Sequence, residues 1–441
     1  MQAVLVIPRA HDHQLSIGNV RFDERPGIHY SDMALDLSIT LQQPNERASV
    51  EYCQFLDSKA ALMKVLHVAP CFHPAYSYGG PIRSTFELCR NLGELGCDVR
   101  VLTTDANGLD EVLEVDTNDE VELPEGFRVR YCPRRLRHSV SPTLMRLLPA
   151  YMRWADVVHL TAVYSFPTFP TVFWARSMNK PLIWSPRGAL QRWKGSRRIG
   201  IKGVWDFLWY HAADPAELMM HVTSEFENRE TSSRFPKLRM AMIPNGVDVP
   251  AVLSRREGNG ELRLLFIGRL DPKKGIEALL KACSLAAPPP WRLAIAGWGA
   301  PEYVSQLKEQ IHALGLSGRV EMLGAVLSNE KKGLFERSDV ALVPSYTENF
   351  AIVVAEALAH GVPVIASKGT PWSRLEEMRC GLWVDNDPES LADAIRNVST
   401  MPLQDMGRRG REWMQREFSW RSVTNQMLAL YRECARRYRS R

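Results

Sequence analysis

The sequence lacks any run of about 18 uninterrupted apolar residues, the length that a membrane-spanning helix needs. The N-terminus also lacks the basic, apolar and small-residue pattern of a secretion signal, and none of the eight cysteines forms a CxxC pair. We therefore expect buried, reduced thiols in a cytoplasmic protein, and any membrane contact would be peripheral.

Several common catalytic motifs are also missing. No phosphate-binding GxxxxGK[ST] loop, zinc-binding HExxH or GxSxG nucleophile elbow occurs. The segment Asp385–Asp387 matches a metal-binding DxD motif, but it directly precedes Pro388, so a capped helix start is the better interpretation. The segment His11–His13 has no partner residues around it. We expect neither a metal nor another cofactor.

The sequence contains one predicted pattern of elements that occurs twice: a strand, a glycine-rich loop, a helix and a second strand. In the first half, a buried strand at Met63–Pro70 precedes the turn Tyr78–Pro81, a helix and the strand Val99–Leu102. In the second half, the pattern starts with a strand at Leu262–Ile267 and ends with one at 291–296. Such alternation predicts an α/β protein with two Rossmann-like, doubly wound domains facing a central cleft.

The domain boundaries follow from turn signals. Residues 1–62 show no clear elements, so we expect a poorly ordered extension, and Met63 is a candidate natural start. The turn signal Ile243–Asp248 marks a hinge between two domains. The predicted parts are the extension at 1–62, an N-terminal domain at 63–243, a C-terminal domain at 244–425 and a terminal helix at 426–441 that packs back on the N-terminal domain.

The net charge of +5 is unevenly distributed. The stretch from 105 to 127 contains acidic residues and no basic one, whereas Lys and Arg dominate from 128 to 202. A solvated surface explains this pattern, but the same field would favour an anionic acceptor or a phosphate-rich membrane. Nucleic acid is not expected as a partner, because no recognised binding motif accompanies the charge.

Two glutamates flank the start of a predicted helix in the second half. Glu348 follows the buried strand Val340–Val343, and Glu356 lies in the helix Ala351–Ala359, for which Asn349 is the expected N-cap. Eight residues at about 1.5 Å rise separate the two glutamates by roughly 12 Å, about the reach from the sugar to the ribose of a nucleotide sugar. The alternative is an ordinary helix with one acid near its start and one salt-bridged acid inside.

The loop Gly268–Gly275 follows the first strand of the same domain. Parallel sheets bind ligands at the carboxyl ends of their strands, so Arg269 and Lys274 would both project towards a ligand there. Arginine supplies a planar fork and lysine a point charge, which suits a diphosphate. A solvated basic turn is the alternative, which the nearby glutamate pair makes less attractive.

The first domain offers weaker candidates. Gly79 and Gly80 would let a ligand approach the backbone and would direct a helix start into the cleft. His159 closes the predicted strand Asp156–Leu160, at another strand end. A buried core histidine with satisfied hydrogen bonds is the alternative interpretation of His159.

Taken in order, these motifs resemble glycosyltransferase family 4. The segments that carry the resemblance are YGGP, DVVHL, TSEFE, IPNGVD, GRLDPKKG, AGWG and PSYTENFAIVVAEALAHGVPVIAS. The resemblance runs from about Met63 to the end of the chain and is strongest in the second half. The segments SPRGAL and GTPW resemble the polysaccharide and lipopolysaccharide branches of the family.

The resemblance implies a GT-B fold, with the donor held by the 244–425 domain and the acceptor by the 63–243 domain. It also implies transfer with retention of anomeric configuration and no essential metal. The implied catalytic residues are Glu348 at the donor sugar, Arg269 and Lys274 at the leaving diphosphate, and His159. The implied donor contacts are Gly79, Gly80, Gly268, Val326, Leu327, Asn349, Phe350, Ala351 and Glu356, the last at the ribose hydroxyls.

The sequence departs from the family pattern in two places. Asn349 and Ala351 stand on either side of Phe350 where glycine is common, and Ala351 narrows the room for a sugar. Thr161 replaces a second histidine that many members carry two residues after the position of His159. The first departure affects donor choice, and the second weakens the assignment of His159.

A mixed basic and aromatic segment supplies the candidate acceptor or membrane contacts. These residues are Arg187, Arg192, Trp193, Lys194, Arg197 and Arg198. Such a mixture suits a membrane interface and a lipid diphosphate, although aromatic core residues beside solvated cations would give the same pattern.

The sequence therefore predicts a retaining glycosyltransferase at the cytoplasmic side, including the inner face of the membrane. It would move a sugar from a UDP- or GDP-sugar to a saccharide or lipid-diphosphate-linked acceptor in surface polysaccharide biosynthesis. The alternatives are a nucleotide-sugar epimerase of the same architecture and a non-catalytic sugar-nucleotide-binding subunit.

Overall fold

The computed structural model falls into two units, Met1–Ala61 and Leu62–Arg441, each of which is described by itself. The described residues are 3–7, 16–20, 63–76, 79–108, 110–137, 139–191, 218–253, 260–286, 290–326 and 328–439.

The first unit contains a pair of antiparallel strands. Strand β1 (Ala3–Ile7) pairs with β2 (Ser16–Val20), and Ala3 lies opposite Val20. These two strands were not predicted from the sequence. The apolar run Ala3–Ile7 is itself a strand signal.

The second unit begins with an eight-stranded sheet in the order β10-β9-β8-β7-β3-β4-β6-β5. All neighbours are parallel except β5, which pairs antiparallel with β6. The strands are β3 (Lys64–Val68), β4 (Asp98–Thr104), β5 (Val121–Glu122), β6 (Arg128–Cys132), β7 (Val157–Thr161), β8 (Leu182–Ser185), β9 (Leu218–Val222) and β10 (Arg239–Met242).

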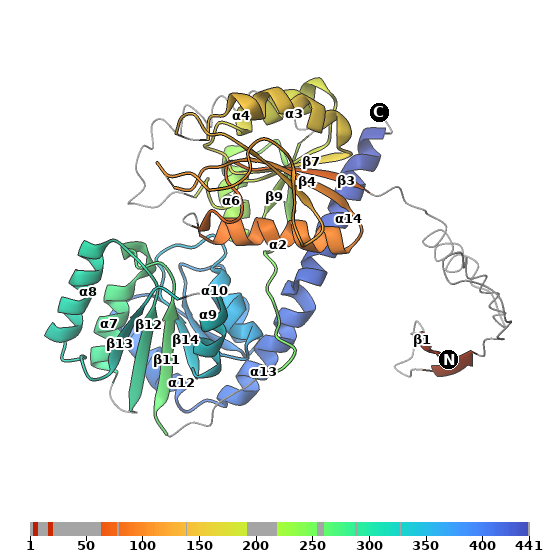
Figure 1. Cartoon of the computed structure of the whole chain (residues 1–441). Helices are drawn as coiled ribbons and strands as arrows, with labels where there is room; N and C mark the ends of the chain where they lie inside the picture. The colour runs from red at the N-terminus through yellow and green to blue at the C-terminus, as the bar shows by residue number, and fades with distance from the viewer. Residues whose placement is uncertain are drawn as a thin grey trace. The chain divides into compact units, whose positions relative to one another are not determined.

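Helices cover both faces of this sheet (Figure 1). They are α2 (Gly80–Glu94), α3 (Pro142–Trp154), α4 (Thr168–Ser177) and α6 (Glu225–Arg234). Side chains alternate along β3, so Leu66 packs in the core with α3 and α4, whereas Val65 packs with α2. Two-sided burial explains why the strand reads as a continuous apolar run.

The C-terminal sheet has six strands, all parallel, in the order β13-β12-β11-β14-β15-β16. The strands are β11 (Leu262–Ile267), β12 (Trp291–Ala296), β13 (Val320–Gly324), β14 (Val340–Val343), β15 (Val364–Ser367) and β16 (Gly381–Val384). Together with the first sheet, they confirm the prediction of two doubly wound domains.

The helices of this domain also form two layers. They are α7 (Ile276–Leu285), α8 (Pro301–Ala313), α9 (Ser328–Glu336), α10 (Ile352–Ala359), α11 (Arg374–Glu377), α12 (Pro388–Val398) and α13 (Leu403–Trp413). Leu279 of α7 and Ile395 of α12 share one core with Leu264 of β11, while Leu358 of α10 packs in the other core with Leu265.

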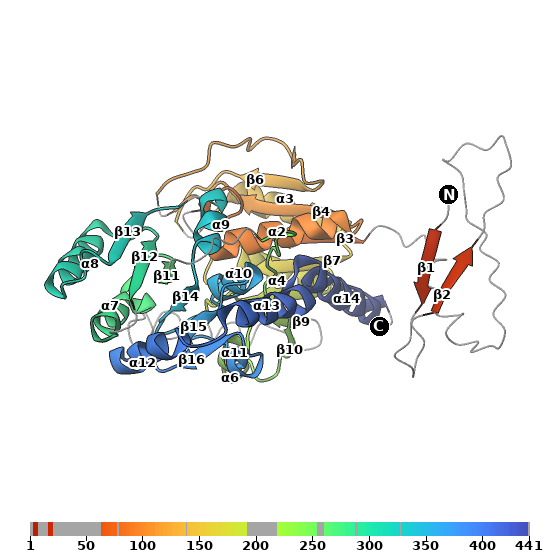
Figure 2. The same cartoon turned by 90° about the horizontal axis from the view of Figure 1, so that it is seen from below.

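The last helix, α14 (Trp420–Arg439), returns to the N-terminal domain (Figure 2). Its apolar face, including Trp420, Met427 and Tyr431, belongs to the core that contains Val65 and Leu88. The helix begins six residues before the predicted position 426. Because Val247 donates its backbone N–H to Phe418 O at 2.8 Å, the two chain crossings between the domains lie side by side.

The remaining features of the fold are the apolar character of its helices and the state of its cysteines. No helix in the described ranges is both long and apolar enough to span a membrane. The seven cysteines in those ranges are free thiols, and all but the partly exposed Cys71 are buried. The expectation of buried thiols is therefore met at these positions with that one exception.

Candidate functional site

The cleft between the two sheets contains a cavity of about 540 Å³ at the carboxyl ends of the strands. The predicted residues that line it are Gly79, Gly80, Arg187, Gly268, Arg269, Lys274, Val326, Glu348, Asn349, Phe350 and Ala351. Leu327 lies outside the described residues. The fold thus gathers segments that are more than 250 residues apart in the sequence.

Glu348 lies against the basic loop. Lys274 Nζ forms an ion pair with Glu348 Oε1, and Ser345 Oγ donates to the same oxygen at 2.8 Å. Both charged side chains are largely buried, with Glu348 11% exposed and Lys274 19% exposed. A ligand phosphate at this place would share Lys274 with the glutamate.

Three cations converge on this part of the cavity. Arg269, Lys273 and Lys274 all line it, and the Arg269 guanidinium lies 5.8 Å from the centre of the Trp298 ring. Burial lowers the pKa of Lys273, and Lys274 and Arg269 lower it further, whereas Glu348 raises it. Three positive charges facing one carboxylate leave an excess that suits a diphosphate. Sequence reasoning missed Lys273, although it stands in the same basic loop.

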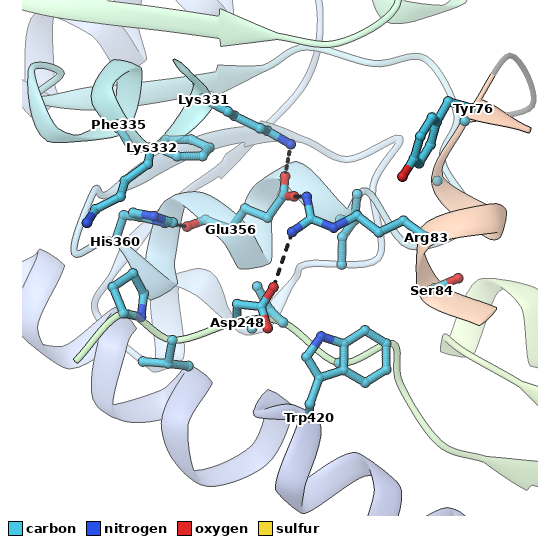
Figure 3. A pocket seen from close by; sticks show the side chains of 17 residues that line it. Tyr76, Arg83, Ser84, Asp248, Lys331, Lys332, Phe335, Glu356, His360 and Trp420 are labelled. Carbon is cyan, nitrogen blue, oxygen red and sulfur yellow. Dashed lines mark hydrogen bonds and ion pairs between the residues drawn. The ribbon is translucent and has the colours of Figure 1, made fainter. Parts of the chain in front are cut away.

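Glu356 lines a second cavity of about 490 Å³ (Figure 3), which shares with the first the lining residues Gly79, Gly80, Ser84, Lys331 and Ile352. Lys331 Nζ pairs with Glu356 Oε2, and Arg83 Nη1 lies 3.5 Å from Glu356 Oε1. Arg83 Nη2 also donates to Asp248 Oδ2 at 3.1 Å.

The contacts of Glu356 fit both interpretations of the glutamate pair, a ligand-binding acid and a salt-bridged acid inside a helix. Its carboxylate lies at a cavity, as a ligand contact must, and it is also salt-bridged, as the alternative expected. Arg83 comes from α2 in the other domain, so no helical spacing pointed to it. Lys331 lies in α9, and its only signal was the basic pair that it forms with Lys332.

The start of α10 differs from the prediction. The N-cap residue is Ala351, in a left-handed conformation with φ 57°, and no side chain caps the helix. Asn349 instead crosses the cleft, where its Nδ2 donates to Thr223 Oγ1 at 2.9 Å. The prediction of Asn349 as N-cap is therefore wrong, because the cap position lies two residues later. Ala351, Ile352 and Val353 line the cavity, so the uncapped helix start faces it and could receive a ligand anion.

The start of α2 is the N-terminal domain's counterpart. Gly79 is its N-cap with φ 77°, a conformation that glycine adopts without steric cost. A Cβ atom on Gly79 or Gly80 would meet no atom within 4 Å. Glycine is therefore favoured at position 79 by its positive φ and not by crowding around a side chain. The space before the helix is open to a ligand.

Two family models match consecutive parts of the chain. The model described as Glycosyltransferase Family 4 matches residues 78–250, and the model described as Glycosyl transferases group 1 matches residues 254–413. The chain belongs to glycosyltransferase family 4. It is accordingly an enzyme of the glycosyltransferase class with the GT-B fold, and it acts on nucleotide sugars in glycan biosynthesis.

Relatives of this family 4 enzyme are themselves glycosyltransferases. It is 26% identical to a GDP-mannose:cellobiosyl-diphosphopolyprenol alpha-mannosyltransferase of Xanthomonas oryzae pv. oryzae, over 84% of this chain and 97% of that one. It is 30% identical to a D-inositol 3-phosphate glycosyltransferase of an Arthrobacter species, over 56% and 60%. Sucrose-phosphate synthase of Thermosynechococcus elongatus has the same fold, with a TM-score of 0.66, 21% identity and coverage of 84% and 98%.

His159 does not line the cleft of the family 4 enzyme. It is fully buried in β7, where its Nδ1 and Nε2 lie 2.6 Å from Tyr431 Oη and from Ser185 Oγ. Burial is the main cause that holds its pKa well below the usual value, followed by the neighbouring His67 and His221. The catalytic prediction for His159 is therefore corrected to the alternative, a satisfied core histidine, because the ring is buried between the sheet and α14.

The predicted acceptor residues are only partly described. Arg187 lines the cavity, and its Nη1 donates to Asn245 Oδ1 at 2.5 Å. The others lie outside the described residues: Arg192, Trp193, Lys194, Arg197 and Arg198.

The DxD-like segment is a helix start, as predicted. Asp387 is the N-cap of α12, and its carboxylate accepts the backbone N–H of Ser390 at 2.8 Å. Asp385 pairs with Lys368 at 2.7 Å. Within the described residues, no group of three or more His, Cys, Asp or Glu side chains is placed to hold a metal ion.

Proposed function

We propose that this enzyme transfers a hexose from a UDP- or GDP-sugar to a saccharide or lipid-linked acceptor, with retention and without a metal. The observation that supports this most is the position of the charged groups: three cations and Glu348 lie at one end of the cleft, and Glu356 lies at the other. This arrangement provides separate places for the diphosphate, the sugar and the ribose of one donor molecule.

In the proposed reaction, the bond between the sugar C1 and the diphosphate oxygen breaks, and an acceptor oxygen forms the new bond to C1. The acceptor hydroxyl gives its proton to the departing diphosphate oxygen on the same face of the sugar. Arg269, Lys273 and Lys274 stabilise the negative charge that develops on the diphosphate. Fixed cations in a partly buried cleft can do this without a metal ion.

The two glutamates position the donor. Glu348, held by Lys274 and Ser345, accepts hydrogen bonds from the sugar hydroxyls, while Glu356 accepts hydrogen bonds from the ribose. Lys331 fixes the Glu356 carboxylate and also reaches the cavity that holds the diphosphate. Neither glutamate needs to move a proton in this scheme.

GDP-mannose and a diphosphate-linked saccharide are the first substrates to test, because they are named for the Xanthomonas relative. We place the enzyme in surface polysaccharide biosynthesis, in the cytoplasm at the inner face of the membrane. Lys and Arg around the N-terminal domain would favour such a peripheral contact. Co-sedimentation with vesicles of anionic lipid, lost at high salt, tests that contact.

The central experiment measures nucleoside diphosphate release from a panel of nucleotide sugars, with and without acceptor, in EDTA. Acceptor-dependent release in EDTA, with an α-linked product from an α-linked donor, supports the proposal. Strict dependence on a divalent ion overturns metal independence. An altered sugar nucleotide without acceptor would instead identify an epimerase.

A further inference from the structure

The loop that carries Glu348 is contacted by the N-terminal domain at two successive residues. Asn349 Nδ2 donates to Thr223 Oγ1 at 2.9 Å and to Glu227 Oε2 at 3.3 Å. Gln191 Nε2 donates to the carbonyl oxygen of Glu348 at 3.2 Å. These bonds cross from one domain to the other, so they exist only while the two domains lie against each other at this place.

Glu227, in the first turn of α6, is the fixed end of these contacts. The residue is 1% exposed, and its carboxylate accepts the backbone N–H groups of Gly188 at 2.5 Å and of Thr223 at 2.7 Å. The Thr223 hydroxyl donates to the same carboxylate at 2.8 Å. A carboxylate with this many donors is held in one position. We call the chain of hydrogen bonds from Asn349 through Thr223 to Glu227 the interdomain bridge.

The direction of hydrogen bonding in the interdomain bridge follows from its chemistry. An ionised carboxylate only accepts hydrogen bonds, so the Thr223 hydroxyl gives its single hydrogen to Glu227. Thr223 Oγ1 can then only accept from Asn349, which must present its amide NH₂ group. Aspartate has the same shape but no hydrogen to give, and it would place a second carboxylate beside Glu227. Glycine, which is common at this position in the family, could not form the interdomain bridge either.

The stability of the fold is a poor explanation for the interdomain bridge. The Oδ1 atom of Asn349 is buried and has no hydrogen-bond partner among the residues that the structure describes. A Cβ atom on Gly188 would lie 2.9 Å from Asn349 Cβ, so the two loops already touch. An unpaired buried carbonyl destabilises a fold by at least as much as one neutral hydrogen bond stabilises it. The Asn349 side chain therefore contributes little net stability, and a role in positioning accounts better for its place.

The residue that the interdomain bridge positions is Glu348. The backbone N–H of Glu348 donates to Gly369 O at 2.9 Å within its own domain, whereas its carbonyl and the next side chain are held by the other domain. Ser345 and Lys274 hold its carboxylate. Separation of the two domains would break the cross-domain bonds and leave Glu348 held from one side only.

We propose that Asn349 is a positioning residue, which acts through Glu348 and is anchored by Glu227. The interdomain bridge sets the Glu348 carboxylate for sugar transfer only when the N-terminal domain has closed on the donor loop. This inference rests on the proposed function, in which Glu348 contacts the donor sugar. Asn349 therefore governs the transfer step and leaves the affinity for the donor unchanged.

Steady-state kinetics and calorimetry test this role in Asn349→Ala. We expect kcat for acceptor-dependent release of nucleoside diphosphate to fall about tenfold, which corresponds to about 1.4 kcal/mol, while the donor Kd stays within about twofold. The melting temperature should stay within about 2 °C, because little net stability is lost. A donor Kd that weakens about tenfold with unchanged kcat would overturn the proposal, since Asn349 would then be a donor contact.

Two further variants distinguish the interdomain bridge from simple filling of space. Asn349→Asp keeps the size of the side chain, yet it should lower kcat more than Asn349→Ala does, because two carboxylates would face each other. In a Thr223→Val background, Asn349→Ala should lower kcat by less than about threefold, because the hydroxyl that accepts its bond is already gone. Losses that multiply in the double variant, or full activity of Asn349→Asp, would overturn the proposal.

Asn397→Ala is the matched control. Asn397 is an exposed asparagine of α12 and does not line the cleft cavity. Its substitution removes the same amide group, and kcat should stay within about twofold of the wild-type value. An equal loss of kcat in Asn397→Ala and Asn349→Ala would contradict a specific role for Asn349.

Hydrogen exchange of the segment 345–350, measured without substrates, tests the interdomain bridge itself. Its amides should exchange about tenfold faster in Asn349→Ala, whereas Asn397→Ala should match the wild type. Unchanged exchange in Asn349→Ala would overturn the proposal. Failure of the wild type to transfer sugar from any donor would overturn the proposed function, on which the exchange measurement does not depend.

Discussion

At the scale of the residue, the two glutamates flank one helix start but have different neighbours. Glu348 contacts Lys274 and lies in the cavity of the three cations, whereas Glu356 contacts Lys331 and the interdomain Arg83. Their substitution should therefore affect different steps of the reaction.

We expect Glu348→Gln to lower kcat by about 10² to 10³ with less than about threefold change in donor Kd, because its contacts strengthen as charge develops. Glu356→Gln should instead weaken donor binding by about tenfold, the worth of a charge-assisted hydrogen bond. Nucleoside diphosphate release gives kcat, and calorimetry gives Kd. Equal effects of the two substitutions would mean that the donor lies in another orientation.

Ala351 has a backbone conformation that is unfavourable for a residue with a Cβ atom. Its φ of 57° costs an L-residue with a Cβ about 1 to 2 kcal/mol, and glycine avoids that cost. After the greater entropy of unfolded glycine is subtracted, Ala351→Gly should raise the free energy of unfolding by about 0.5 to 1 kcal/mol. Urea denaturation measures it.

Ala355→Gly is the matched control, since Ala355 is buried inside α10. That substitution should destabilise the chain by about 1 kcal/mol or more, because glycine in a helix interior is unfavourable. A loss of stability in both variants would contradict the explanation of Ala351 by backbone conformation.

At the scale of the element, a chain of buried histidines joins three strands to α14. Tyr431 of α14 contacts His159 of β7, which contacts Ser185 of β8, which in turn contacts His221 of β9 at 2.6 Å. The ring centres of His67 in β3 and His159 lie 4.5 Å apart, with the two rings tilted by 35°. These contacts hold the terminal helix on the sheet, and burial lowers the pKa of each ring, which favours its neutral form.

This cluster predicts acid lability. Burial lowers the pKa of His67 and of His221 to about 3. In the unfolded chain the same rings protonate near pH 6.5, so below that pH the unfolded state binds more protons. The contribution of the neutral rings to the free energy of unfolding should therefore be complete above about pH 6.5. It should be lost progressively as the pH falls from 6.5 to 3.

The expected size is about 2 kcal/mol for each of the two rings between pH 6.5 and pH 5, from 1.36 kcal/mol per pKa unit. Urea denaturation at several pH values measures it. His221→Gln should reduce the slope, whereas His312→Gln, at an exposed position of α8, should not. An unchanged slope in His221→Gln would contradict a role for the cluster.

At the scale of the whole molecule, ion pairs connect the two domains across the cleft. Arg83 from α2 reaches Glu356 in α10 and Asp248 in the linker, and its side chain is 43% exposed. If Glu356 binds the ribose as proposed, Arg83 would compete with it for the Glu356 carboxylate.

Removing that competitor should tighten donor binding. We expect Arg83→Gln to lower the donor Kd by about twofold, since an exposed ion pair is worth about 0.5 kcal/mol. Arg90→Gln is the control, because Arg90 shares the Asp248 contact, at 3.9 Å, but its other ion pairs are with Glu87 and Glu94 of α2 rather than with Glu356. A donor Kd that rises in Arg83→Gln would show that Arg83 itself binds the donor.

Local signals were sufficient for most of the fold. Strands β11, β12 and β14 have the predicted bounds, because a long apolar run bounded by turn residues locates a buried strand from sequence alone. Order along the chain was enough to predict two doubly wound domains, since alternating strands and helices form parallel sheets. The family resemblance likewise required only the linear order of its motifs.

The sequence by itself determined the two domains, the basic loop of Arg269 and Lys274, and the glutamate pair. Only the tertiary structure decided that His159 lies in the core, that Asn349 crosses the cleft, and which residues come from the opposite domain. Arg83 is 273 residues from Glu356. No periodicity in the sequence predicts such a contact, because it depends on how the two sheets and the returning helix pack. That packing is a property of the folded chain as a whole.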